Sequence, residues 1–116
     1  MKDFVVEYSQ YGRRIVKGLG YYEKKPVEDL KQLVKNCARE YGNKVGFKFK
    51  TSDGTIVEKN YIQFEQEIDC LGTALVARGF KGWRISIISE NRYEWALCFF
   101  AIINGTGIGV PLDKYL

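Results

Sequence analysis

Histidine is absent from the 116 residues of this chain. Imidazole is the usual general base beside a Ser or Cys nucleophile, and it is also the commonest metal ligand in proteins. Its absence excludes Ser-His and Cys-His triads, histidine general bases and histidine-containing metal sites. Much of hydrolytic and metal-dependent catalysis is therefore closed to these residues.

Cysteine is scarce, and the chain holds only Cys37, Cys70 and Cys98. They are odd in number, far apart and never spaced as C-x-x-C, so the sequence predicts neither a disulfide framework nor a zinc site. Each lies on or beside an apolar stripe of helical spacing, and free cysteine behaves as a small hydrophobic residue. We expect three reduced, mostly buried thiols.

Long hydrophobic runs are missing too. No stretch approaches the roughly 20 apolar residues that span a bilayer. The opening segment, MKDFVVEYSQYGRR, lacks the apolar centre of a secretory signal. With 46% hydrophobic and 28% charged residues, the composition is typical of one small globular domain. We expect a cytoplasmic protein with at most peripheral membrane contact.

The net charge of +4 is unevenly divided along the chain. Residues 1–50 hold twelve Lys and Arg against six Asp and Glu, whereas residues 51–116 hold six against eight. This asymmetry is compatible with a self-contained module that binds nucleic acid or anionic membrane, and equally with a solvated basic face. The solvated face is the simpler interpretation, and a nucleic-acid partner is not expected.

The first 25 residues contain four of the eight tyrosines, Tyr8, Tyr11, Tyr21 and Tyr22, mixed with glycine and basic residues. No sustained period is visible, so we interpret residues 1–25 as an irregular, Tyr-rich basic arm. Such tyrosines can stack on bases, but nucleic-acid platforms place their aromatic residues on a sheet or in a groove. Aromatic side chains that tie the arm onto a larger body are the favoured interpretation.

Residues 26–116 are interpreted as a partial α/β subdomain. Apolar residues at helical spacing predict a helix from Pro26 to about Tyr41, ended by Gly42. Alternation over Val45–Lys50, followed by a Ser-Asp-Gly turn signal, predicts a half-buried hairpin whose second strand covers Thr55–Glu58.

A helix and then a βαβ unit are predicted for the rest. Asn60 and Gln63 have the spacing of a capping box at the start of the helix. A strand over Arg84–Ile88, a helix from Asn91 to about Asn104 and a strand over Ile108–Val110 follow, and the two strands should be parallel. The fold class is therefore α/β: a β-hairpin plus a βαβ unit with flanking helices, incomplete as the first part of a larger domain.

The helix of this βαβ unit contains an unbroken apolar segment, WALCFFAII, over residues 95–103. A helix that is hydrophobic all round must be covered all round. The segment is too short to span a membrane. The cover must come from a second copy or from further chain, and the end at Leu116, just after a new strand, favours the remainder of a longer polypeptide. Self-association through residues 95–103 is the alternative.

Gly105, Gly107 and Gly109 invite comparison with a phosphate-binding loop. Such loops run from a strand into a helix N-terminus, where N–H groups and the helix dipole face the anion. These glycines run from a helix C-terminus into a strand, and the sixth position of the motif is Val110. We expect structural glycines that end the helix and let a strand pack closely.

The best-placed polar residues follow the strand that ends at Ile88, where open α/β sheets gather ligands. Asn91 and Glu94 are the two candidate crevice residues, although a helix cap at Asn91 with Glu94 three residues later explains both. No catalytic, cofactor-binding or metal-binding residue is assigned. Three acidic residues form only the polar face of a helix and receive no catalytic role: Glu65, Glu67 and Asp69.

Three blocks from Lys59 onward resemble the AMP-forming acyl-CoA synthetases of the adenylate-forming superfamily. The first, KNYIQFEQEIDCLGTALVARGFKGWRI, resembles a family helix that opens with Tyr-x-x-Phe and leads to a glycine turn and a strand. The second, ISENRYEWALCFFAIINGTG, contains the segment Glu90–Trp95, which is typical of the long-chain fatty acid branch. The third, GIGVPLD, is similar to a family strand motif that ends in Pro-Leu-Asp.

This resemblance implies a two-step reaction. A carboxylate attacks the α-phosphate of Mg-ATP to give an acyl-adenylate and pyrophosphate, and the thiol of coenzyme A then displaces AMP. The family's phosphate loop, nucleotide-binding residues, magnesium-binding acid and catalytic lysine would all lie beyond Leu116. ATP, Mg²⁺ and coenzyme A are thus expected cofactors of a longer parent enzyme, and the chain alone is expected to be an inactive scaffold.

Overall fold

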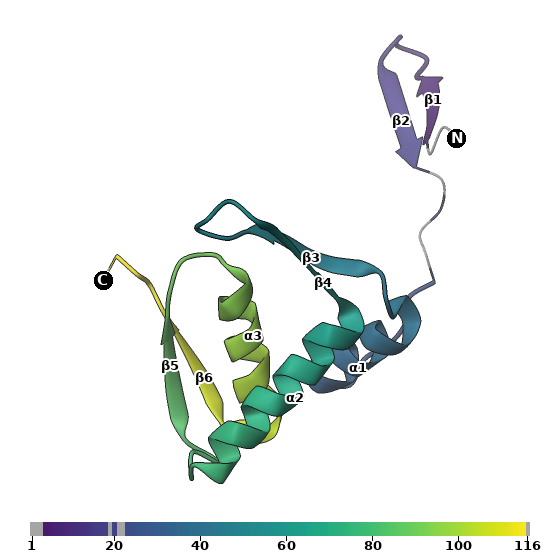
Figure 1. Ribbon diagram of the computed structural model, residues 1–116. Coiled ribbons are helices and arrows are strands. Elements are labelled where there is room, and N and C mark those ends of the chain that lie inside the picture. Colours follow the sequence, from purple (N-terminus) through teal and green to yellow (C-terminus); the bar gives the residue numbers. More distant parts are fainter. Residues whose placement is uncertain (1–3, 19, 21–22, 116) are drawn as a thin grey trace.

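The computed structural model describes residues 4–18, 20 and 23–115 (Figure 1). In chain order the elements are β1 (Phe4–Tyr8), β2 (Arg14–Gly18), α1 (Leu30–Tyr41), β3 (Val45–Lys50), β4 (Ile56–Asn60), α2 (Tyr61–Ala77), β5 (Arg84–Ile88), α3 (Tyr93–Ala101), the π-helical turn η1 (Ile102–Thr106) and β6 (Ile108–Leu112). The strands pair as β1–β2, β3–β4 and β5–β6. None of the described helices is long and apolar enough to cross a bilayer.

The N-terminal segment is a regular antiparallel hairpin, so the prediction of an irregular arm was wrong. Strands β1 and β2 pair from Phe4 opposite Gly18 to Tyr8 opposite Arg14. Between them the Ser9 hydroxyl accepts hydrogen bonds from two backbone N–H groups of a turn that contains Gly12 at φ 74°. The β-branched residues on both sides of that turn were the overlooked signal.

The same hairpin stands away from the helices in Figure 1, and the molecule measures 65 × 37 × 34 Å. Tyr8 and Tyr11 are 71% and 81% exposed. These two side chains therefore do not tie the segment onto the body, contrary to the favoured interpretation. Tyr21 and Tyr22 lie outside the described residues.

Helix α1 begins at Leu30, four residues after the predicted start at Pro26. Asp29 has extended backbone, and its carboxylate accepts a hydrogen bond from the Gln32 N–H at 2.6 Å. A carboxylate that satisfies an unpaired N–H fixes a helix start more strongly than a proline that merely tolerates the first turn. The predicted end is confirmed, because Gly42 has φ 52° and its N–H bonds the Ala38 carbonyl.

The β3–β4 hairpin and the start of α2 are confirmed. The turn is held by Asp53, whose carboxylate accepts hydrogen bonds from the Thr55 N–H and hydroxyl. The Asn60 side chain accepts from the Gln63 N–H, and the Gln63 side chain accepts from the Asn60 N–H, so the predicted capping box is complete. Strand β4 thus runs directly into α2, with the capping box at their junction.

The βαβ unit is also confirmed, with β5 and β6 parallel and Arg84 opposite Ile108. Its helix starts at Tyr93, however, with Arg92 in the cap position, and the described structure shows no side-chain cap hydrogen bond there. The predicted cap at Asn91 was therefore wrong. Glu94 instead pairs with the Arg92 guanidinium, at 2.7 Å from Oε2 to Nε.

The helix ends through η1, where Gly105 has φ 124° as the predicted terminator. The glycines after it let β6 pack closely, as expected. A Cβ on Gly107 would lie 2.3 Å from the Trp83 carbonyl oxygen, and one on Gly109 would press on Ile103 and Phe99. These are packing constraints of the sheet and helix.

The core lies where α1, α2 and α3 meet the β3–β4 hairpin (Figure 1). Its buried members are Val34, Phe64, Ile68, Tyr93 and Ala101. The three cysteines are free thiols, but the prediction that they are mostly buried was wrong: Cys70 is exposed, and Cys37 and Cys98 are only partly covered. Free apolar surface therefore remains on the helices that carry them.

Candidate functional site

The predicted crevice lies at the carboxyl ends of β5 and β6, where residues 89–92, 94 and 113–115 form a polar surface that we call the crest. The parallel register brings Ile88 beside Leu112, so the segments Ser89–Asn91 and Asp113–Tyr115 leave the sheet together. With Trp95 they line a groove of about 630 Å³. The crest therefore lies at the carboxyl ends of parallel strands, the edge at which open α/β sheets bind ligands.

Ion pairs occupy much of the crest. The Lys114 Nζ lies 2.9 Å from the Glu90 Oε1. This hydrogen bond lowers the pKa of the Glu90 carboxyl and raises the pKa of Lys114. The Arg92 guanidinium likewise lowers the pKa of Glu94. Both carboxyls stay ionised at neutral pH, so neither is suited to general acid catalysis there.

Asn91 and Glu94 do meet in one place. Both line a groove of about 400 Å³ between the start of α3 and the turn of the β3–β4 hairpin, which contributes Phe49–Ser52. Asn91 is exposed, and Glu94 is already paired with Arg92. The structure thus brings the two candidates together at a surface groove, with the charge of Glu94 compensated.

A third groove, of about 550 Å³, is mainly apolar and runs between α2, β5 and α3. Arg92 and Glu94 stand among its lining residues, and the remaining lining side chains are chiefly aliphatic or aromatic: Leu71, Leu75, Ile85, Ile87, Ile88, Trp95, Cys98 and Ile102. Trp95 stacks on Phe99 at 5.2 Å between ring centroids. The segment predicted to need cover is therefore only partly covered.

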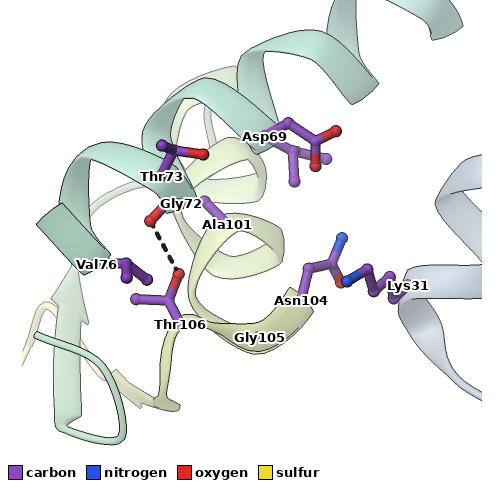
Figure 2. Close-up of a pocket in the computed structure, with 10 residues that line it drawn as sticks. Lys31, Asp69, Gly72, Thr73, Val76, Ala101, Asn104, Gly105 and Thr106 are labelled. Carbon is purple, nitrogen blue, oxygen red and sulfur yellow. Dashed lines mark hydrogen bonds between the residues drawn. The ribbon is translucent and has the colours of Figure 1, made fainter.

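A smaller pocket of about 290 Å³ lies between α1, α2 and η1 (Figure 2). Lys31, Asp69 and Asn104 are among its polar lining residues, and the Thr106 hydroxyl donates to the Gly72 carbonyl at 3.3 Å beside it. Within the described residues the buried Asn104 Oδ1 has no hydrogen-bond partner. An unpartnered buried acceptor costs free energy.

One polar cluster was missed by the sequence reasoning. Glu67 was assigned to a solvated helix face, yet it accepts a 2.6 Å hydrogen bond from the Tyr93 hydroxyl and pairs with Lys59. Partial burial raises the pKa of Glu67, but the hydrogen bonds from Lys59 and Tyr93 outweigh this and lower it. Burial and the nearby carboxylate raise the pKa of Tyr93. The cluster is structural, joining β4, α2 and α3.

No arrangement in residues 4–18, 20 and 23–115 brings together three or more Cys, Asp or Glu side chains that could hold a metal ion. The described residues form a folded unit with an open apolar groove and with ion pairs at the crest. The hydrogen bond from Tyr93 on α3 to Glu67 on α2 depends on how the two helices pack, so the sequence alone could not predict it.

In sequence, the chain is similar to a section of CoA ligases. Over 90 residues it is 28% identical to a crotonobetaine/carnitine–CoA ligase of Citrobacter koseri, a match that covers 77% of this chain and 17% of that protein. The corresponding ligases of Salmonella paratyphi B and Escherichia fergusonii are 26% identical over the same extent. These names do not single out a long-chain fatty acid branch.

In structure, the chain shares its fold with part of CmiS6. The TM-score is 0.64 at 21% sequence identity, and the match covers 78% of this chain and 23% of that one. No protein-family model matches the chain. The chain thus spans less than a quarter of the length of each of these relatives.

Proposed function

We propose that these residues are the N-terminal scaffold of an ATP-dependent, AMP-forming acid–thiol ligase. The observation that carries the proposal is the 90-residue likeness to CoA ligases, which covers 77% of this chain but 17% of the relative. The structural likeness to part of a longer chain supports the same conclusion.

The uncovered apolar surface supports a scaffold role. Parallel sheets are almost always covered on both faces, yet here β5 and β6 form a two-stranded sheet whose outward face exposes Ile88, Ile108 and Leu112. The groove between α2, β5 and α3 is open as well. In the proposed parent enzyme the remainder of the polypeptide covers both.

The chemistry is assigned to that remainder. The acyl-adenylate step develops charge on phosphate oxygens and needs positioned cations and backbone donors. The cations of the crest, Arg92 and Lys114, are paired with carboxylates and exposed. ATP, Mg²⁺ and coenzyme A therefore bind elsewhere in the parent, and residues 1–116 alone are inactive.

The proposed substrate is a long-chain fatty acid. Its support is the segment Glu90–Trp95, which is typical of that branch. The relatives' names make crotonobetaine and carnitine the competing carboxylates. A pocket for the acyl chain belongs to the remainder of the enzyme, so substrate choice is tested there.

The test has two arms. Isothermal calorimetry of the 116-residue chain with Mg-ATP should show no saturable binding. The polypeptide from the complete reading frame should release pyrophosphate when given a fatty acid and ATP, and form acyl-CoA when coenzyme A is added; crotonobetaine and carnitine serve as comparison substrates. Saturable ATP binding by the short chain, or no carboxylate-dependent pyrophosphate release by the long one, contradicts the proposal.

Variants in the longer polypeptide separate scaffold from ligand contact. Asn91→Ala and Glu94→Gln should leave kcat and KM within about twofold, because neither side chain is proposed to touch substrate. A KM raised about tenfold or more by Asn91→Ala alone would assign the crest to ligand binding instead.

A further inference from the structure

The β1–β2 hairpin presents an apolar face with nothing described against it. Phe4, Val6 and Tyr8 alternate along β1, and Val16 lies directly opposite Val6 on β2, so these four side chains share one face. Their exposed fractions are 45%, 36%, 71% and 56%. The hairpin stands away from the helices, so this face is open (Figure 1).

The opposite face is different in character. It carries Glu7 and Lys17, which form an ion pair at 2.5 Å, together with Val5 and Ile15. The hairpin is therefore amphipathic, with its charge compensated on one side and its larger apolar side chains on the other. Isolated two-stranded hairpins are marginally stable in water, so covering the apolar face stabilises the ribbon.

Positive charge lies at the turn end of the apolar face. Arg13 lies in the turn, Arg14 begins β2 beside Tyr8, and both are exposed. Lys24 and Lys25 follow along the chain, but Lys25 is paired with Glu40 at 2.7 Å, so the charge beside the face is that of the two arginines. Basic residues beside an exposed apolar surface complement an anionic one.

The kinds of side chain on this face favour a lipid bilayer over nucleic acid as the partner. Single-stranded nucleic acid uses aromatic rings for stacking and gains little from valine. A bilayer surface uses all the components present: the aliphatic side chains and Phe enter the acyl boundary, Tyr lies at headgroup level, and Arg attracts anionic headgroups.

We propose that the face formed by Phe4, Val6, Tyr8 and Val16, with Arg13 and Arg14 at its end, docks the chain peripherally onto an anionic lipid bilayer. The hairpin lies flat on the interface, with Glu7 and Lys17 facing water. Each apolar side chain adds burial, and each arginine adds attraction to the anionic headgroups. The inference rests on the hairpin alone and is independent of the proposed ligase function.

Vesicle co-sedimentation of the 116-residue chain tests this. The probes are vesicles of phosphatidylcholine alone and of phosphatidylcholine with phosphatidylserine. We expect binding to the anionic vesicles only, weakened by added salt. The variant Val6→Ser/Val16→Ser should bind about tenfold or more weakly, since each valine contributes burial. The double variant Arg13→Gln/Arg14→Gln should lose about tenfold or more, at about fivefold per charge.

The matched control is Val5→Ser/Ile15→Ser, which removes two β-branched residues from the opposite face and should bind within about threefold of the parent chain. Its result also guards against loss through unfolding of the hairpin, because it has the same effect on β-propensity. Equal losses for the two serine pairs, equal binding to both vesicle types, or binding to a single-stranded oligonucleotide in place of vesicles would each overturn the proposal.

Discussion

The backbone at Gly107 passes so close to Trp83 that a side chain has no room. A Cβ there would lie 2.3 Å from a carbonyl oxygen of the neighbouring backbone, which cannot rotate away as a side chain can. We expect Gly107→Ala to lower the free energy of unfolding by about 1–3 kcal/mol, as overpacking does. Urea denaturation measures it, with Gly20→Ala, which meets nothing within 4 Å, as the control. Equal stability of the two variants would contradict the close approach.

The folding stability of the chain should depend on pH through Glu67. Its pKa in the folded chain is lowered, so the protonated form is disfavoured by folding. The resulting stability is fully present above the unfolded-state pKa, about 4.3, and is lost as the pH falls through the lower folded-state pKa. We expect Glu67→Gln to flatten the stability profile below about pH 5, because it has no proton to bind.

The measurement is the urea midpoint from neutral pH to about pH 3. Glu65→Gln on the same helix is the control and should retain the slope of the parent chain. A Glu67→Gln profile as steep as that of the parent would place the acid sensitivity elsewhere. Tyr93→Phe, which removes the hydroxyl that donates to Glu67, should shift the profile in the same direction by a smaller amount.

At the scale of elements, the sequence predicted those helix ends that are fixed by hydrogen bonds between residues close together in the chain. The capping box of α2 and the glycine end of α1 are satisfied within a few residues, so their sequence patterns were sufficient. The start of α3 was not predictable in this way, because Glu94 is captured by Arg92 and not by the backbone ahead of it. The Glu67–Tyr93 contact joins positions 26 residues apart, which no local pattern contains.

This contrast makes a prediction about two asparagines. Asn60→Ala removes a working cap and should lower the free energy of unfolding by about 1 kcal/mol. Asn91→Ala removes no cap hydrogen bond and should change stability by less than about 0.5 kcal/mol. Thermal unfolding of the two variants side by side measures the difference. If Asn91→Ala lowered the free energy of unfolding as much as Asn60→Ala, Asn91 would act as the helix cap that the sequence predicted.

At the scale of the whole molecule, the open face of the parallel sheet controls behaviour in solution. Ile88 and Ile108 are 60% and 53% exposed there. Beside them, the groove against α3 leaves Trp95 and Cys98 partly uncovered. Apolar surface of this kind is rarely left in water by a monomer. We therefore expect the isolated chain to self-associate through the β5–β6–α3 side as its concentration rises.

Sedimentation velocity over a concentration series measures this, and Ile88→Lys/Ile108→Lys should shift the chain toward monomer, because a buried ammonium pays a desolvation cost that an isoleucine does not. Ile56→Lys is the control: Ile56 is similarly exposed, at 62%, but lies on β4 of the β3–β4 hairpin. It should leave the association unchanged. The expectation would be wrong if the parent chain stayed monomeric at every concentration, or if only Ile56→Lys changed its association. Either result would mean that the exposed face of the β5–β6 sheet needs no covering layer.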